Sequence, residues 1–359
     1  MPDSLRQDLV EESDPKAPLT KRILAVAVRY LLPLALTILL VWYMFRKISF
    51  GEMMEILRHG VDYWWILCAM AISVFSHIFR AMRWRIQLRA LDINAPLMAL
   101  SCSVFGCYAL NLVFPRLGEV WRCTYIASRQ KAPFTKVLGS MVADRLADTL
   151  TVASLLLLCF IVAAPAINAF LTRYPVGRDI IALISNPWLW VALVVAGIAG
   201  WWALRRFRNA APVRKLLGML AQLWQGFAVV TSMPGKWRFL MLTLCIWGCY
   251  FLQLYVAFFA FPFTRDLCAE PGLAWGLTPC LVAFVLSSIG MAIPSNGGLG
   301  PWNIAVMFGL AIYGISDPQG TAFSMLQWSG QTVMLILLGI FTMVYISVSG
   351  SKNRASRNG

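Results

Sequence analysis

Three charged residues, Arg116, Glu119 and Arg122, directly follow an apolar stretch of the sequence. On a helix that begins near Gly118, Glu119 and Arg122 are three residues apart and share a face, with Arg116 on the loop before it. Two arginine forks suit a phosphodiester, and Glu119 can either hold one arginine in position or meet a cationic headgroup. The alternative is a salt-bridge cluster at the membrane surface that only anchors the chain.

A second charged group, Asp144, Arg145 and Asp148, lies near the start of the apolar stretch Ser140–Ala164. Asp144 and Asp148 are one helical turn apart and therefore share a face. Because a charge at membrane depth is costly, we expect both carboxylates to point inward and to be paired. The candidate partners are Arg83, Arg116 and Arg122. Two roles stay open, an ion-pair brace between the hairpin that contains Arg116 and this span, and direct contact with a substrate.

The segment Pro294–Pro301 reads Pro-Ser-Asn-Gly-Gly-Leu-Gly-Pro, which no continuous helix tolerates. A half-helix can begin at Pro301, because proline is favourable at the first helical position. The free amides of such a first turn bind anions, phosphates included, and glycines let a headgroup approach the backbone. The alternative is a structural kink that binds nothing. The candidate substrate-binding residues of this segment are Gly297, Gly298, Gly300 and Asn303.

Other polar residues have simpler interpretations. Asn111, four residues before Pro115, is positioned to cap or bond an interrupted backbone, and it is also a candidate substrate-binding residue. His77 is predicted to be a packed histidine. Gln327 and Gln331 share a helix face and either line a cavity or bond neighbouring helices. A basic group with a tryptophan is predicted to mark the membrane boundary without further function. This group comprises Arg80, Arg83, Trp84, Arg85 and Arg89.

The signatures of several enzyme classes are missing from the sequence. There is no phosphate-binding loop of the GxxxxGK[ST] type, no GxSxG and no HExxH. The nine cysteines form no CxxC pair, and His59 and His77 are the only histidines. Arg145 lies between Asp144 and Asp148 and opposes binding of a divalent cation. We therefore expect no metal, no cofactor and no ATP-driven transport by this chain alone.

The composition is that of a membrane protein. Of the 359 residues, 59% are hydrophobic and 13% are charged, and the mean hydropathy is +0.69. The net charge of +15 falls between apolar runs, where it sets topology and meets anionic lipid rather than nucleic acid. Residues 1–22 are polar and proline-containing, which predicts a disordered tail and no signal peptide. Residues 23–348 form one predicted transmembrane domain, and residues 349–359 a basic tail.

Nine apolar stretches are candidate helices of this all-α domain. They are Ile23–Phe45, Val61–Phe79, Leu97–Phe114, Ser140–Ala164, Trp188–Leu204, Phe239–Phe261, Ala274–Ile293, Trp302–Ile315 and Phe323–Val348. Two amphipathic stretches, Ile48–Leu57 and Val213–Phe227, suit helices that lie in the membrane interface or pack on the bundle.

Two of the stretches do not fit a simple crossing. A helix rises about 1.5 Å per residue and the apolar core is about 30 Å thick, so Trp302–Ile315 is too short. Leu97–Phe114 is followed by Pro115-Arg116-Leu117-Gly118-Glu119 and then by Val120–Gln130, which is too polar to return through lipid. We predict two re-entrant hairpins, each of which enters the membrane, turns and leaves on the same side.

The distribution of basic residues supports this arrangement for the first hairpin. With a cytoplasmic N-terminus and re-entrant hairpins, 23 of the 31 Lys and Arg residues lie on the cytoplasmic side of a plasma (inner) membrane. The C-terminus is then cytoplasmic too. Each hairpin lies between two full spans, and the two units open to opposite sides. This resembles an inverted-topology repeat, as found in many transporters.

At these residues the chain resembles the transmembrane-region family of the lysylphosphatidylglycerol synthases, which are flippase-like integral membrane proteins. The resemblance covers roughly Ile23 to Val348. It rests on Asn111…Pro115-Arg116-Leu117-Gly118-Glu119…Arg122, Asp144-Arg145…Asp148 and Pro294…Gly297-Gly298-Leu299-Gly300. It implies translocation of a lipid headgroup, aminoacylated phosphatidylglycerol in the best-known branch. The family often has an acidic residue just after the glycine motif; here Pro301-Trp302-Asn303 follows, so a cationic headgroup is not implied.

These observations favour a transporter that moves a phospholipid or glycolipid headgroup between leaflets. The chain ends at Gly359 without a soluble aminoacyltransferase domain, so we expect no synthesis of lysylphosphatidylglycerol. Two alternatives stay open. One is a membrane-embedded transferase acting on a lipid phosphate, with Glu119 or Asp144 as base. The other is a non-catalytic partner of a separately encoded lipid-modifying enzyme.

Overall fold

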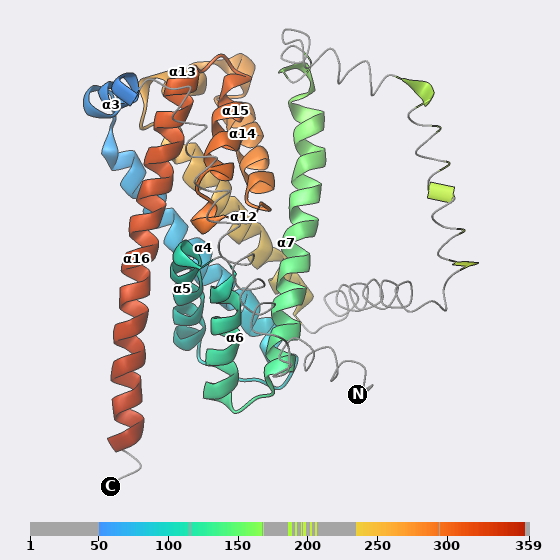
Figure 1. Ribbon diagram of the computed structural model, residues 1–359, viewed down its shortest axis with the longest axis vertical. Helices are drawn as coiled ribbons and strands as arrows, with labels where there is room; N and C mark the ends of the chain where they lie inside the picture. Colours follow the sequence, from blue (N-terminus) through green and yellow to red (C-terminus); the bar gives the residue numbers. More distant parts are fainter. Residues whose placement is uncertain are drawn as a thin grey trace, which may run out of the picture.

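Figure 1 shows the computed structural model of the chain as a bundle of helices. It describes residues 50–114, 116–166, 235–293 and 295–355, with scattered positions between 168 and 206. Every regular element in these ranges is helical, as predicted. Several predicted features lie outside the described residues. These are the tail 1–22, the span Ile23–Phe45, nearly all of Trp188–Leu204, the stretch Val213–Phe227, Pro115 and Pro294.

Long helices run the height of the bundle. They are α4 (Tyr63–Arg89), α7 (Phe134–Val162), α12 (Lys236–Phe258) and α16 (Asp317–Ala355). Each contains a stretch long and apolar enough to cross a membrane, and so does Pro271–Gly290. Large apolar side chains stay exposed on α7 and α16, among them Leu157, Ile161, Leu337 and Met343. Exposure on this scale is expected of surfaces that face lipid rather than water.

Shorter helices complete the bundle in two antiparallel pairs. One pair is α5 (Leu97–Val113) and α6 (Leu117–Gln130), and the other is α14 (Leu277–Gly290) and α15 (Pro301–Ala311). Figure 1 places the first pair in the half of the bundle that contains the C-terminal end of α4, and the second pair in the opposite half. Short elements cap the latter half: α3 (Phe50–His59), α13 (Pro262–Ala269) and the 3-10 turn η1 (Pro271–Leu273).

The chain is interrupted within each of these pairs, near the middle of the bundle. Arg116, between α5 and α6, has a left-handed backbone with φ of 63°. Between α14 and α15 lies the 3-10 turn η2 (Asn296–Gly298), followed by Gly300 with φ of 91°. The two interruptions touch, because the Asn296 side-chain amide donates to the Val113 carbonyl at 2.8 Å. A carbonyl at the end of α5 is thereby satisfied by the other pair.

The helices α4 and α3 can be compared directly with the stretches predicted from the sequence. The predicted span Val61–Phe79 was too short, since α4 continues for ten further residues to Arg89. The amphipathic stretch Ile48–Leu57 forms α3, whose Met53 is buried and whose Ile56 packs on the main core. Of its two predicted settings, packing on the bundle is therefore confirmed.

The main core lies between α4, α12, α14, α15 and α16. Its aromatic centre is formed by Phe258, Phe261 and Phe323, and the rings of Phe258 and Phe323 meet edge to face at 5.4 Å. A second core fills the space between the C-terminal part of α4, α5, α6 and the start of α7, around Trp84 and Leu100. This second core forms one wall of the charged cluster described next.

Candidate functional site

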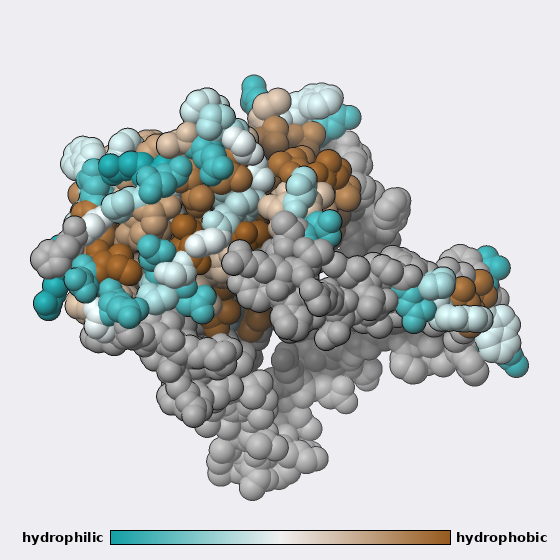
Figure 2. Space-filling view, turned by 90° about the horizontal axis from the view of Figure 1, so that it is seen from above, coloured by the Kyte–Doolittle hydropathy of each residue, from teal (hydrophilic) through white to brown (hydrophobic). Residues whose placement is uncertain are grey.

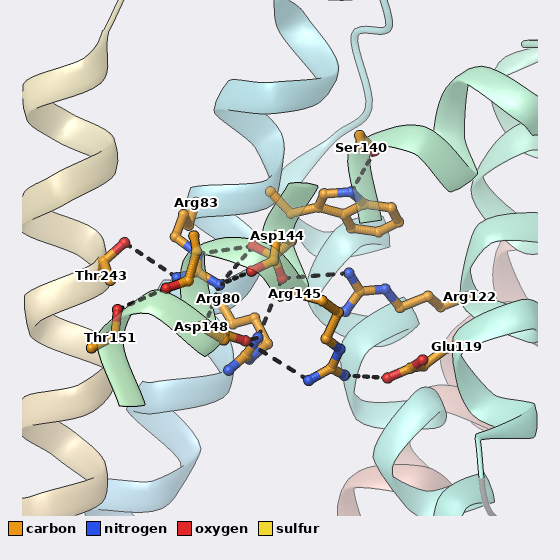
Figure 3. Close-up of polar contacts among 12 residues, drawn as sticks. Arg80, Arg83, Glu119, Arg122, Ser140, Asp144, Arg145, Asp148, Thr151 and Thr243 are labelled. Carbon is orange, nitrogen blue, oxygen red and sulfur yellow. Dashed lines mark hydrogen bonds and ion pairs between the residues drawn. The ribbon is translucent and has the colours of Figure 1, made fainter. Parts of the chain in front are cut away.

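Seven charged residues from three helices, α4, α6 and α7, meet in the space between these helices (Figure 3). Arg80 and Arg83 come from α4, Glu119 and Arg122 from α6, and Asp144, Arg145 and Asp148 from α7. We call these seven residues the charged cluster. Four arginines face three carboxylates, so the cluster holds one positive charge in excess. Charges at this depth in a membrane protein require partners or a ligand.

The centre of the cluster is a four-residue ion-pair network. Arg80 reaches Asp148 at 2.7 Å and Asp144 at 3.2 Å. Arg83 reaches Asp144 at 2.7 Å and Asp148 at 2.8 Å. Thr243 of α12 accepts a further hydrogen bond from Arg83 at 3.2 Å. The network therefore holds α4, α7 and α12 together. The brace predicted for these aspartates was a different one, between the first hairpin and α7, and the contact of that kind is Arg122 to Asp144 at 3.7 Å.

Arg122 is buried without a hydrogen bond. Its side chain is 0% exposed, and none of its three guanidinium nitrogens has a hydrogen-bond partner among the described residues. The guanidinium lies over the Trp84 ring at 4.3 Å and is 3.7 Å from an Asp144 oxygen. A guanidinium has five N–H donors, and burying them unbonded is unfavourable. Arg122 thus carries unused donor capacity.

The exposed edge of the cluster is the pair Glu119–Arg145, whose charged atoms are 2.5 Å apart. The two side chains are 21% and 36% exposed. Arg145 is also 3.8 Å from Asp148. Glu119 does hold an arginine, as predicted, but this arginine is Arg145 of α7 and not its neighbour Arg122 on α6.

The α5–α6 pair holds Arg122 against the cluster by close backbone packing. A Cβ at Gly118 would overlap the Cys107 carbonyl of α5, so only glycine allows this approach. The Asn111 side-chain oxygen accepts a hydrogen bond from the Gly118 amide at 2.9 Å. The prediction that Asn111 bonds the interrupted backbone is confirmed. The first turn of α6 is thereby fixed one turn before Arg122.

The remaining predicted site residues lie apart from the cluster. Arg116 is exposed at the start of α6, and the expected pairing with Asp144 or Asp148 is wrong, since their basic partners are Arg80, Arg83, Arg122 and Arg145. Gly300 donates its amide to the Asn303 side chain at 3.1 Å, and the Gly297 carbonyl accepts from Trp328 at 2.9 Å. Among the described residues, no hydrogen bond or ion pair joins Gly297, Gly298, Gly300 or Asn303 to the cluster.

Two surface pockets lie at opposite ends of the bundle. One, of about 460 Å³, is lined by α3, Pro262 and Gln319, and the other, of about 410 Å³, by Asp92, Lys131 and Lys136. Figure 2 looks onto the end that carries the first pocket and shows hydrophilic residues scattered among apolar ones. No residue of the charged cluster lines either pocket. The cluster is thus closed off from both of these pockets.

Comparison with known proteins identifies the chain. A sequence profile of the lysylphosphatidylglycerol synthase TM region matches residues 30–339. The chain belongs to this family. The match extends over the charged cluster, both helix interruptions and most of α16. As a member of a membrane-embedded family with several apolar helices, it is a membrane protein.

The chain is also similar to part of a protein that is named as a glycosyltransferase. Glycosyltransferase AglD of Haloferax volcanii is 30% identical over 138 residues. The similarity covers 38% of this chain and 21% of the relative. The chain therefore matches about a fifth of the relative's length, and what the relative does as a whole is not carried over by this match alone.

The membrane-boundary position predicted for Arg80 and Arg83 was wrong, whereas the pairing offered for Arg83 with Asp144 and Asp148 is confirmed. Both were expected at the membrane boundary, but in the structure they are buried at 2% and 0% exposure and ion-paired. A signal for this was present in the sequence. Polar residues recur at helical spacing along α4 and are all buried, which marks an inward-facing stripe. The stripe is Ser73, Ser76, His77, Arg80, Arg83, Trp84 and Gln87.

The sequence also made predictions for His77, for Gln331 and for metal binding. His77 is buried, and its ring centroid lies 4.6 Å from that of Tyr108 with the two planes tilted, so the packed setting is confirmed. Gln331 accepts a hydrogen bond from Ser73 of α4 at 3.1 Å, which is the interhelical bonding considered for it. Within the described residues, no group of three or more His, Cys, Asp or Glu side chains could hold a metal ion.

Proposed function

We propose that the chain moves a phosphate-bearing lipid headgroup between the leaflets of the membrane while the acyl chains stay in lipid. The observation that carries this proposal is Arg122, a fully buried guanidinium without a hydrogen-bond partner among the described residues, in a cluster with one positive charge in excess. A phosphate supplies the missing negative charge and the missing acceptors, and arginine recognises phosphate well.

The helix interruptions support a path through the membrane. Irregular backbone survives at membrane depth only where protein or a wet cavity surrounds it. In this proposal α5–α6 and α14–α15 are re-entrant hairpins that enter from opposite sides and meet where Asn296 contacts Val113. The two units would then form the inverted arrangement typical of transporters. The described structure, with the tips in contact and the cluster buried, is the closed state of this path.

The charges at the two ends of the bundle support an orientation. One end of the bundle contains the C-terminal ends of α4 and α6 and the starts of α7 and α12 (Figure 1). In or next to these helix ends the sequence has Arg85, Arg89, Arg129, Lys131, Lys136, Lys236 and Arg238, with Asp92 as an acidic exception. The other end contains α3, α13 and the starts of α4 and α16, where the sequence has Glu52, Glu55, Asp62, Asp266, Glu270 and Asp317, with Arg58 and Arg265. By the positive-inside rule the basic end is cytoplasmic, in a plasma or inner membrane, with both termini on that side. A ligand would then reach the cluster from the cytoplasmic leaflet, on the side where α6 lies.

The direct test is translocation of fluorescent phospholipids in proteoliposomes. The decisive variant is Arg122→Gln, which keeps a polar side chain and removes the positive charge. Arg129→Gln is a matched control, because Arg129 lies two turns later on the same helix but is exposed and stacks on Tyr125. We expect at least roughly a tenfold loss of rate for Arg122→Gln and less than about a twofold change for Arg129→Gln. Equal rates for the two variants would reject the proposal.

A second candidate function is favoured by the relative named as a glycosyltransferase. In it, the chain is the membrane partner of a separately encoded enzyme that modifies a lipid-linked headgroup. A transferase reaction within the chain itself fits less well, because the oxygens of Asp144 and Glu119 are already held by arginines. Mass spectrometry of lipids after incubation with the purified chain separates the cases, since a transferase leaves a covalently altered lipid.

A further inference from the structure

We propose that Arg122 and Arg145 form one anion site for a phosphate monoester dianion, and that Glu119 occupies this site as an internal substitute when no ligand is bound. The proposal rests on the proposed function only for the expectation that the anion belongs to a lipid. It assigns Glu119 a role opposite to substrate binding, because its carboxylate competes with the ligand.

The bonding within the cluster separates a saturated part from an open part. Asp144 and Asp148 are each held by both Arg80 and Arg83, so the two carboxylates are saturated, and of these two arginines only Arg80 keeps an unbonded nitrogen, Nε. The open part consists of Arg122 and Arg145. All three guanidinium nitrogens of Arg122 and Nε of Arg145 have no hydrogen-bond partner among the described residues. Apart from Arg80 Nε, whose side chain is held by both aspartates, the unbonded donors of the cluster belong to these two arginines.

Burial shows how a ligand would reach these donors. Arg122 and Asp144 are both 0% exposed, whereas Glu119 and Arg145 form the accessible edge of the cluster. Figure 3 shows Glu119 and Arg145 extending from α6 and α7 toward each other beside Arg122. An anion that reaches Arg122 from outside must displace the Glu119–Arg145 pair.

The charges of the cluster select the class of anion. Once Glu119 swings away, four arginines face only Asp144 and Asp148, which leaves two positive charges. A phosphate monoester carries nearly two negative charges at neutral pH, since its second pKa is about 6. A phosphodiester carries only one and leaves the buried excess in place. The site therefore favours a terminal phosphate over a headgroup linked on both sides.

Binding to the purified full-length chain in detergent tests this site. The probes are short-chain phosphatidic acid, short-chain phosphatidylglycerol and inorganic phosphate, measured by calorimetry at pH 7.5. The variants are Glu119→Gln and Arg122→Gln, with Glu270→Gln as a control because Glu270 is an exposed glutamate at the opposite end.

We expect Glu119→Gln to bind phosphatidic acid roughly threefold to fivefold more tightly, because a half-exposed ion pair no longer competes. Arg122→Gln should bind it at least roughly tenfold more weakly, and Glu270→Gln should match the wild type. Phosphatidic acid should bind more tightly than phosphatidylglycerol. Inorganic phosphate that binds as tightly as phosphatidic acid would assign the site to the free anion instead of a lipid.

Several outcomes would overturn the proposal. Unchanged or weaker binding by Glu119→Gln would show that this carboxylate is no competitor, and Glu119→Ala serves as a second variant for the same comparison. Equal binding of the two lipids would refute the selection of a dianion. Translocation measured in parallel separates this proposal from the preceding one. Tighter binding by Glu119→Gln without any translocation keeps the site and rejects transport, whereas translocation with unchanged binding does the reverse.

Discussion

The two helix interruptions solve the same backbone problem in the same way. At the α5–α6 interruption, the Asn111 side chain accepts a hydrogen bond from the Gly118 amide at 2.9 Å. At the α14–α15 interruption, the Asn303 side chain accepts one from the Gly300 amide at 3.1 Å. In each case an asparagine satisfies a backbone donor that a broken helix leaves free. The two asparagines approach from opposite directions along the chain, one before its glycine and one after it.

The two pairs also pack closely through a glycine that faces a carbonyl. Gly118 of α6 meets the Cys107 carbonyl of α5, and Gly290 at the end of α14 faces the Pro301 carbonyl at the start of α15. Small residues at such places let two backbones approach, which matters in a membrane because packing drives helix association there. The shared features therefore concern how an interrupted chain is held together.

The difference between the pairs lies in their charges. The α6 helix carries Glu119 and Arg122 into the charged cluster, whereas α14 and α15 contain no charged residue. Under the proposed function, the two similar backbone arrangements would have different roles: the first pair would bind the headgroup, and the second would shape and close the path beside it. Variants that break these features one at a time test this division.

The largest loss of stability is expected when the carboxylate that contacts Arg122 of the α5–α6 pair is removed. Asp144→Asn removes a carboxylate that is fully buried and contacts Arg80, Arg83 and Arg122. Breaking a buried ion pair from one side leaves an uncompensated charge and costs about 3–5 kcal/mol. The free energy of unfolding in mixed micelles, followed by circular dichroism, measures this loss. Asp92→Asn, at an exposed position, is the control, and a loss no larger than that of the control would contradict the prediction.

The next effect compares the close backbone approaches. Gly118→Ala puts a methyl group into the rigid Cys107 carbonyl, so α5 and α6 must separate, at a cost of about 3 kcal/mol. At Gly290 the added carbon would lie 2.7 Å from the Pro301 oxygen, which a smaller shift relieves at a cost of about 1–2 kcal/mol. Only Gly118→Ala should also slow translocation, because it moves the helix that carries Arg122. The reverse order of the two losses would show that the second pair is the more tightly constrained.

The sequence reveals the interruptions better than it reveals their surroundings. Proline and glycine at Pro115, Gly118 and Pro294–Pro301 break any helix, so these positions could be predicted from local chemistry alone. Asn111 was also predictable, because a side-chain acceptor four residues before a break has few other partners. These inferences need only neighbours in the chain, which the sequence supplies.

The ion pairs of Arg80 and Arg83 needed information that is not local. An arginine at the end of an apolar stretch is as common at a membrane surface as inside a bundle. What decides between these settings is where α7 brings Asp144 and Asp148, more than 60 residues later in the chain. Glu119 shows the same limit, since helical spacing paired it with Arg122 whereas tertiary packing pairs it with Arg145.

The two asparagines allow a matched comparison with a smaller effect. Asn303→Ala leaves the Gly300 amide buried without an acceptor, because Asn303 itself is 0% exposed, and should cost about 1–2 kcal/mol. Asn111→Ala should cost about 1 kcal/mol, since Asn111 is only half-buried. Both losses are measured by the same unfolding assay. A larger loss for Asn111→Ala than for Asn303→Ala would mean that the α5–α6 interruption contributes more to the stability of the protein than the α14–α15 interruption does.

The smallest effect concerns the contact that joins the two interruptions. Asn296→Ala removes one hydrogen bond, from its side-chain amide to the Val113 carbonyl at 2.8 Å, in an exposed setting. Water or a polar headgroup can replace this donor, so the net loss should stay below about 1 kcal/mol. Amide hydrogen exchange should speed up by no more than roughly fivefold in residues 114–118, with no change along α7.

This last variant is informative because its two possible consequences differ in sign. If the two pairs meet only to close the path, weakening their contact favours the open state, and lipid translocation by Asn296→Ala should be as fast as in the wild type or faster. If the contact instead holds the second pair in its working position, translocation should slow while exchange spreads into α14 and α15. Asn94→Ala, at an exposed loop position at the basic end of the bundle, controls for loss of an asparagine as such. Slower translocation by Asn296→Ala alone would give the uncharged pair a part in moving the headgroup, and the division of roles between the two interruptions would have to be redrawn.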